Sequence, residues 1–142
     1  MRLAVLASFV FCLALDAKAI PQNATKRRVP CKTPENAAAC YWTHGRLSFY
    51  NGTPAYRVWK VGTKRLLGIY SGPTAWHGDQ LAIDNEDPEF PANVARAWDP
   101  RIGVDIFADF EICPLEPERS GFMQASCIES AKNIFVERYS SK

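Results

Sequence analysis

Polar and apolar positions alternate most regularly between Ile102 and Ile112 of this 142-residue chain. From Ile106 onward every second residue is apolar, and from Asp105 onward every second residue is acidic or aromatic. Successive side chains of a β-strand point to opposite faces of a sheet, so this two-residue period predicts a strand with one buried face. A shorter alternation at 133–137 predicts the last strand of the chain.

Three earlier segments predict a meander of strands. Residues 45–50 alternate, residues 55–61 are rich in β-branched and aromatic side chains, and residues 64–70 form a third such run. An Asn-Gly dipeptide follows the first run and a Gly-Thr dipeptide follows the second, and both are typical of turns. These segments therefore predict strand, turn, strand, turn and strand in succession.

Two short segments favour helix. Residues 33–41, with the sequence TPENAAACY, combine a threonine that can cap a helix with three consecutive alanines. Residues 92–98 are the one helical stretch expected in the connection between the third and fourth strands. The loops expected at 71–79 and 114–120 contain glycine and proline residues that interrupt regular structure.

The order of these elements indicates a fold class. Three strands, a connection with a short helix and then two more strands is the element order of an oligonucleotide/oligosaccharide-binding (OB) barrel. We therefore expect an all-β or β-rich α+β fold, as a small five-stranded OB-like barrel. It would carry a short helix between strands 3 and 4 and a short N-terminal helix. A β-sandwich and an irregular α+β sheet fit the same element order.

The N-terminal residues have the pattern of a secretory signal peptide. Arg2 precedes an apolar run from Leu3 to Leu15, and Ala17-Lys18-Ala19 is a small-x-small cleavage site. This run is shorter than the roughly 20 apolar residues of a transmembrane helix. We expect a signal peptide at 1–19, a flexible leader at 20–32 and a single small β-rich domain at 33–142.

Removal of that leader peptide leaves four of the five cysteines, an even number that predicts two disulfides in an oxidising compartment. Four cysteines allow three pairings. We expect Cys31–Cys40, which would tie the N-terminal segment to the domain, and Cys113–Cys127, which would close the loop between the last two strands. The chain contains no Cys-x-x-Cys pair and no zinc-site spacing, so we assign no metal site.

Composition restricts the possible partners. The formal net charge of the chain is +2, and 47% of its residues are hydrophobic. Proteins that bind nucleic acid usually present a strongly basic face, so this charge argues against a nucleic-acid partner. No second apolar stretch approaches membrane length, which predicts a secreted or periplasmic protein without a membrane span after cleavage.

Cations and aromatic rings are interleaved around the second turn of the meander. In OB barrels, such side chains on the face of strands 2 and 3 stack on and pair with bases or sugars. We therefore predict a ligand-binding face there. Core burial of the tryptophan and simple solvation of the cations are the alternative interpretations. The predicted face consists of Tyr56, Arg57, Trp59, Lys64 and Arg65.

Two pairs of residues offer hydrolase chemistry as an alternative. His77 and Asp79 share an expected loop with hydroxyl side chains, and Asp109 and Glu111 would project from one strand face. A glycosidase usually takes its two carboxylates from different elements, so we assign no catalytic residue and no cofactor. The acidic stretch at 84–89 lacks the spacing of an EF-hand loop and is expected to be solvated.

Six segments of the chain together form a pattern. They are His44-Gly45-Arg46-Leu47, Tyr50-Asn51-Gly52-x-Pro54, Arg57-x-Trp59, Val61-Gly62-Thr63-Lys64-Arg65-x-Leu67-Gly68, Phe110-x-Ile112-Cys113-Pro114 and Cys127-Ile128-Glu129-Ser130-Ala131. This pattern resembles an uncharacterised group of small exported bacterial proteins. The resemblance implies a bacterial exported protein over roughly residues 40–138 and implies no activity.

The sequence thus predicts a secreted or periplasmic, non-enzymatic binding or interaction domain. Its expected partner is an envelope or extracellular protein or glycan. A small secreted hydrolase is one alternative. An inhibitor or accessory subunit of a secreted enzyme is another, because such a protein needs no site chemistry of its own.

Overall fold

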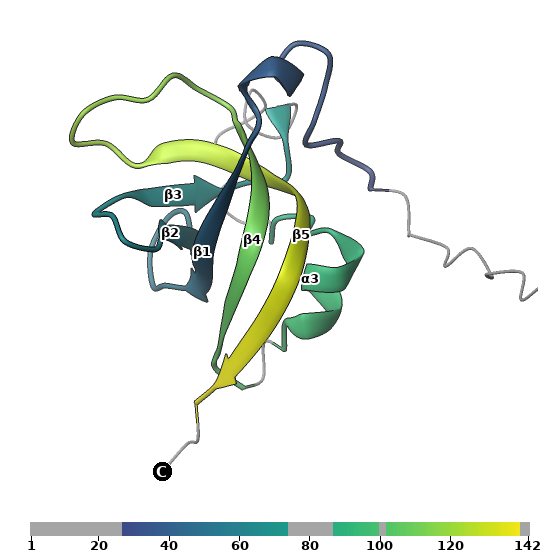
Figure 1. The fold of residues 1–142 in the computed structure, drawn as a ribbon, viewed down its shortest axis with the longest axis vertical. Helices are drawn as coiled ribbons and strands as arrows, with labels where there is room; N and C mark the ends of the chain where they lie inside the picture. Colours follow the sequence, from purple (N-terminus) through teal and green to yellow (C-terminus); the bar gives the residue numbers. More distant parts are fainter. Residues whose placement is uncertain (1–26, 74–86, 100–101, 140–142) are drawn as a thin grey trace, which may run out of the picture.

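The structure is a computed structural model that describes residues 27–73, 87–99 and 102–139. These residues are rich in β-structure and contain one sheet of five strands (Figure 1). A short helix, α3, separates the third strand from the fourth in the chain. The elements are η1 (Ala37–Ala39, a 3₁₀ turn), β1 (Tyr41–Phe49), β2 (Tyr56–Lys60), β3 (Leu66–Ile69), α3 (Ala92–Ala97), β4 (Val104–Pro114) and β5 (Gln124–Arg138).

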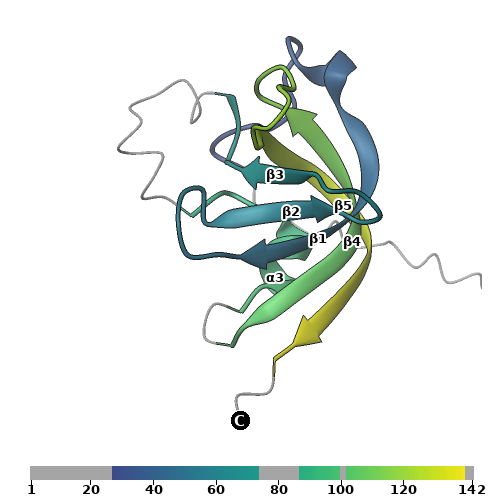
Figure 2. The same ribbon diagram turned by 90° about the vertical axis from the view of Figure 1, so that its left-hand side faces the viewer.

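The sheet closes on itself as a ring. β1 pairs antiparallel with β2 and with β4, and β2 pairs antiparallel with β3. β5 completes the ring by pairing parallel with β3 and antiparallel with β4, so the order is β1-β2-β3-β5-β4. Figure 2 shows β3, β2 and β1 as successive neighbours, with β4 beyond β1. Closure removes the free strand edges that an open sheet exposes to other chains.

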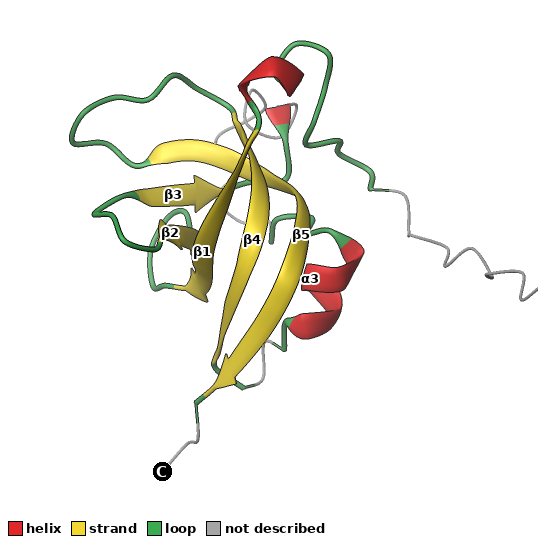
Figure 3. Ribbon diagram, in the orientation of Figure 1, coloured by secondary structure: helices red, strands yellow, loops and turns green. Residues whose placement is uncertain are grey.

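The inward face of the ring forms the hydrophobic core. Leu47, Val58, Leu67 and Ile106, from four different strands, are buried there almost completely. α3 lies against β5 (Figure 3) and adds Val94 to the same core. Full burial of an aliphatic side chain of this size stabilises a fold by about 1.5–3 kcal/mol. The core therefore holds the strands in fixed positions for the side chains on the outer face.

The alternation that predicts a strand at 102–112 is confirmed in β4. Ile106, Phe110 and Ile112 are fully buried, whereas Asp109 and Glu111 on the opposite face are partly exposed. This is the burial pattern of a strand with one face on a core.

The N-terminal part of the domain is less helical than the sequence predicts. Residues 33–41 contain turns and the single 3₁₀ turn η1. The backbone N–H of Thr33 donates to Asn36 Oδ1 at 2.7 Å, which holds the chain in a turn. Tyr41 already belongs to β1 because it pairs with Ile112 of β4. The sheet thus begins at Tyr41, close behind the three alanines, which form only the single 3₁₀ turn.

The predicted pairing of the cysteines is wrong, although all four form disulfides. The bonds are Cys31–Cys127, across 96 positions, and Cys40–Cys113, across 73 positions. The antiparallel register that pairs the start of β1 with the end of β4 places Cys40 next to Cys113. Both disulfides therefore join segments that meet only through the fold, which sequence proximity does not reveal.

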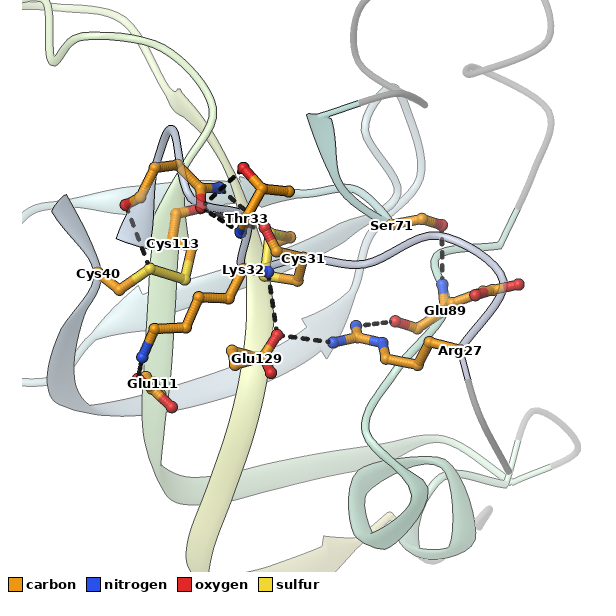
Figure 4. The surroundings of a disulfide bond; sticks show 12 residues. Arg27, Cys31, Lys32, Thr33, Cys40, Ser71, Glu89, Glu111, Cys113 and Glu129 are labelled. Atoms are coloured by element: carbon orange, nitrogen blue, oxygen red, sulfur yellow. Dashed lines mark hydrogen bonds and ion pairs between the residues drawn. A yellow bond between two sulfur atoms is a disulfide. The ribbon is translucent and has the colours of Figure 1, made fainter. Parts of the chain in front are cut away.

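The strap, residues 27–33, runs along the sheet ahead of η1 (Figure 4). The Glu89 carboxylate accepts the backbone N–H groups of two consecutive strap residues, at 2.8 and 3.0 Å. Lys32 Nζ lies 2.7 Å from Glu111 Oε1, and Arg27 donates to the backbone carbonyl of Glu89. These contacts and the disulfide of Cys31 attach the strap to the domain. The sequence analysis had assigned most of this segment to a flexible leader.

Some sequence predictions fall outside the described residues. These are the signal peptide at 1–19, the leader residues 20–26, the pair His77 and Asp79, and residues 84–86 of the acidic stretch. Within 27–73, 87–99 and 102–139, no helix has the length and apolar content needed to cross a bilayer.

Candidate binding groove

The five residues predicted to form a ligand-binding face lie on two different sides of the ring. Tyr56 points into the core, with 6% of its surface exposed. Arg57 and Trp59 lie on the outer side in neighbouring rows of the sheet, opposite Gly68 and Leu66 of β3. The two-residue period of β2 puts neighbouring residues on opposite faces, so Tyr56 and Arg57 cannot act together.

Tyr56 is an aromatic core residue. Its ring makes edge contacts with Phe49, Phe90 and Trp98 at centroid distances of 5.2–5.3 Å. Burial, together with the nearby carboxylate of Asp87, raises the pKa of Tyr56 to about 12. Such packing assigns Tyr56 a role in stability rather than in a surface site on β2.

Trp59 supports the turn between β2 and β3. Its indole N–H donates to the Thr63 carbonyl at 2.7 Å, and the Arg46 guanidinium lies 5.4 Å from its ring centroid. The Thr63 hydroxyl donates a hydrogen bond to the Lys60 carbonyl oxygen at 2.8 Å and accepts one from the backbone N–H of Arg65 at 3.0 Å. The turn is therefore held by side-chain hydrogen bonds, and it fixes where the following two cations lie.

The other three predicted residues meet in a groove of about 420 Å³ on the outer side of β2 and β3. This groove is bounded on its other side by the connection between β4 and β5. Its position explains why the cations gather there, since β2, β3 and that connection each contribute one wall. Its lining residues are Arg57, Lys64, Arg65, Leu66, Gly121, Phe122 and Met123.

The cations of the groove are not equally free to bind a ligand. Arg57 Nε donates to the Pro54 carbonyl at 3.0 Å, and its guanidinium stacks 4.9 Å from the Tyr50 ring centroid. These contacts orient Arg57 but do not neutralise it. Lys64 is exposed and has no ion pair among the described residues. Arg65 lies 2.9 Å from the exposed carboxylate of Glu118.

Phe122 is the aromatic ring of the groove, and the sequence did not identify it. It is 60% exposed, and the Arg119 guanidinium lies 4.9 Å from its ring centroid. Glu116 anchors the base of this connection, because its carboxylate accepts the backbone N–H of Ala125 at 3.0 Å. The signal in the sequence was the position of Phe122, which directly follows Gly121 at the end of the proline-rich loop expected at 114–120. A ring in such a loop is expected to be exposed.

The groove has the chemistry of a binding site for anions. It presents guanidinium and ammonium donors beside a phenyl face, and among the described residues one carboxylate, that of Glu118, compensates one of its three cations. Charged donors form hydrogen bonds roughly twice as strong as neutral ones with anionic acceptors. The described residues that line the groove include no hydroxyl, thiol, imidazole or carboxylate group that could act as a nucleophile or general base.

The carboxylates considered for hydrolysis are engaged elsewhere. Asp109 Oδ2 accepts from Asn133 at 2.7 Å and Oδ1 lies 2.9 Å from His44 Nδ1, contacts that lower the pKa of Asp109. Hydrogen bonds from Lys32 and Ser130 lower the pKa of Glu111. A general acid needs a raised pKa, so this pair does not fit that role.

Metal binding finds no obvious site in the part of the chain that the structure describes. No three His, Cys, Asp or Glu side chains are grouped there in a way that could hold an ion.

Comparison of the chain with family models, with curated proteins and with solved structures finds no match. The geometry of the groove is therefore the basis on which a function is inferred.

Proposed function

We propose that this chain is a secreted or periplasmic, non-enzymatic binding module whose groove holds an anionic glycan. The observation that carries the proposal is the meeting of Arg57, Lys64, Arg65 and the exposed ring of Phe122 in one groove. Uronate or phosphate groups would pair with the cations. The apolar face of a sugar ring would lie on the phenyl ring.

We also propose that the ring is an OB-like barrel. The strand order, the parallel pairing of β3 with β5 and the place of α3 between β3 and β4 support this assignment. OB barrels bind oligonucleotides and oligosaccharides on strands 2 and 3, between the loops that join strands 1–2 and 4–5. The groove has the corresponding position, because β2, β3 and the β4–β5 connection line it.

A glycan is favoured over a nucleic acid by charge and by compartment. The net charge of +2 provides little long-range attraction for a polyphosphate. Two disulfides fit an oxidising compartment, where envelope or extracellular glycans are the abundant extended anions. Export also agrees with the signal-peptide pattern at 1–19 and with the proposed membership in a group of exported bacterial proteins.

The groove can be tested with polygalacturonate as the anionic probe and dextran as the neutral one. Isothermal titration should detect polygalacturonate binding that weakens as salt is added, because the contacts are exposed ion pairs. Reversing two charges with R57E/K64E should weaken binding by at least about tenfold. F122A should also weaken it, through loss of the stacking surface.

The matched control is K132E/R138E, which reverses two exposed charges on β5 outside the groove. This variant should bind polygalacturonate nearly as the natural chain does. Equal losses in K132E/R138E and in R57E/K64E would assign the binding to overall charge and would contradict the groove. Tighter binding of oligo-dT than of polygalacturonate would replace the glycan by a nucleic acid.

Export is tested separately with the full-length chain. Expression in a Gram-negative bacterium should place a product that lacks residues 1–19 in the periplasm or medium. Intact mass measured under thiol-alkylating, non-reducing conditions should show no free thiol. Retention of the uncleaved chain in the cytoplasm would contradict export without affecting the groove.

A further inference from the structure

A second cavity lies where β1 and β4 separate. Their pairing ends at Leu47 and Ile106, although β1 continues to Phe49 and β4 has already begun at Val104. The two strand ends therefore leave an opening in the wall of the ring. A cavity of about 320 Å³ occupies this place, which is at the lower end of the range of about 300–1,000 Å³ for small-molecule sites.

The inner part of this cavity is aromatic. Phe49, Tyr56 and Trp98 line it from the core side, and the rings of Phe49 and Trp98 both contact the Tyr56 ring. Phe49 is 59% exposed, so its ring is accessible at the mouth. A flat apolar ligand face would find rings already fixed in position, which lowers the entropic cost of binding.

The outer part of the cavity is polar. Asp105, which is 3% exposed, receives a hydrogen bond from the Tyr139 hydroxyl and lies 3.6 Å from an Arg46 nitrogen. The Tyr139 ring lies over Gly103, where a Cβ would come within 3.0 Å of it. Arg46 also donates to the Tyr50 hydroxyl at 3.4 Å. Acceptors and donors thus alternate along one side of the opening.

Three polar atoms at the cavity have no hydrogen-bond partner among the described residues. They are Ser48 Oγ, Arg46 Nε and Trp98 Nε1, and all three are enclosed. Enclosed polar groups without partners are rare in folded proteins because each costs free energy. A ligand with hydroxyl groups would complete the site.

We propose that this cavity binds one neutral sugar ring of the pyranose type. The axial C–H face of the sugar lies against Phe49 and the aromatic interior. Its hydroxyls exchange hydrogen bonds with Asp105, Arg46 and Ser48. The site does not require the groove to function, and it could serve a glycan that carries no charge.

Charge favours a neutral ligand over a cation. An aromatic cavity with a buried carboxylate would also suit an ammonium group. Here Arg46 already accompanies Asp105, and the second carboxylate at the cavity, Asp99, is itself engaged in an interaction. A cation would have to share these carboxylates with the groups that now hold them. A sugar hydroxyl can instead donate to one group and accept from the next.

The test uses NMR titration of the folded chain with glucose, N-acetylglucosamine, cellobiose and chitobiose. At least one of them should shift the signals of Ser48, Asp105 and the Trp98 indole together. Phe49→Ala and Ser48→Ala should each weaken that binding by roughly threefold to tenfold. Ser48→Ala should leave thermal stability unchanged or raised, because the hydroxyl has no partner among the described residues.

Phe135→Ala is the control, since this ring is 64% exposed and lies outside the cavity. It should bind each sugar as the natural chain does. Cyclohexanol and tetramethylammonium are added as competing probes. Tighter binding of tetramethylammonium would reassign the cavity to a cation, and equal shifts with cyclohexanol would show only an apolar pocket. Absence of shifts with all four sugars at high concentration overturns the proposal.

Discussion

At the end of the ring where β1 begins, Cys40 is bonded to Cys113 and the strap is bonded to Cys127. At the opposite end β1 and β4 stop pairing, and a cavity takes the place of the missing ladder. The first end is held by covalent bonds, and the second by packed rings and an Arg46–Asp105 contact. We infer that closing one end firmly allows the other to remain open for a ligand.

Removing a disulfide should produce the largest change. The chain-entropy model gives about 4–5 kcal/mol for loops as long as these, and measured losses are typically about 2–5 kcal/mol. C31A/C127A and C40A/C113A should each lower the free energy of unfolding by that amount, measured in urea without reductant. Phe49→Ala at the open end should cost much less because the ring is exposed. Equal losses of unfolding free energy at both ends would show that the disulfide end is not held more firmly than the open end.

Breaking the polar contacts of the open end should have the next largest effect. Asp105→Asn weakens the partner of both Arg46 and Tyr139, so it should destabilise the fold by about 1–3 kcal/mol. Asp109→Asn is the matched substitution on an exposed part of the same strand, and it should cost under about 1 kcal/mol. A larger loss from the exposed aspartate would show that burial of Asp105 is not what matters.

Acid should affect the disulfide end in particular. Hydrogen bonds lower the pKa of Glu111 and of Glu89 from the ordinary value of 4.5. The stability that these carboxylates contribute is present above that value and is lost as the pH falls through their lower folded pKa. Urea midpoints measured from neutral pH to about pH 3 should therefore fall, and Glu111→Gln should reduce the slope. An unchanged slope would show that Glu111 does not contribute to the pH dependence of stability.

Base should affect the open end, with the smallest effect of the four. Its hydrogen bond to Asp105 raises the pKa of Tyr139 to about 12, and burial raises that of Tyr56 to about 12. Stability from these groups is present below pH 10 and is lost as the pH rises toward 12. Ultraviolet titration should show late-ionising tyrosines, and Tyr139→Phe should remove part of that amplitude. An unchanged late step would place it on other tyrosines.

The sequence was most informative where one residue period determines the structure. In β4 the alternation of side chains predicts both the strand and its buried face, because a strand with one face on a core must alternate. The cations at Arg57, Lys64 and Arg65 were likewise found from their spacing. The same period, applied to Tyr56, would have excluded that residue from the outer face.

The remaining features depend on contacts between distant segments. The disulfides follow from the register of β1 with β4, which a local reading of cysteine spacing does not contain. Phe122 reaches the groove because the β4–β5 connection folds toward β2 and β3. The cavity exists because the ends of β1 and β4 separate. The alternating pattern of side chains around Ser48 and Phe49 does not show where the pairing of these two strands stops.

The position of β5 in the ring bears on when the chain can fold during synthesis. β5 leaves the ribosome after β1 to β4, yet it lies between β3 and β4 in the ring and carries Cys127. Without β5, the four earlier strands would leave two unpaired edges, and the core would lack Ile128 and Ala131. The nascent chain therefore stays without a closed sheet until β5 has been made.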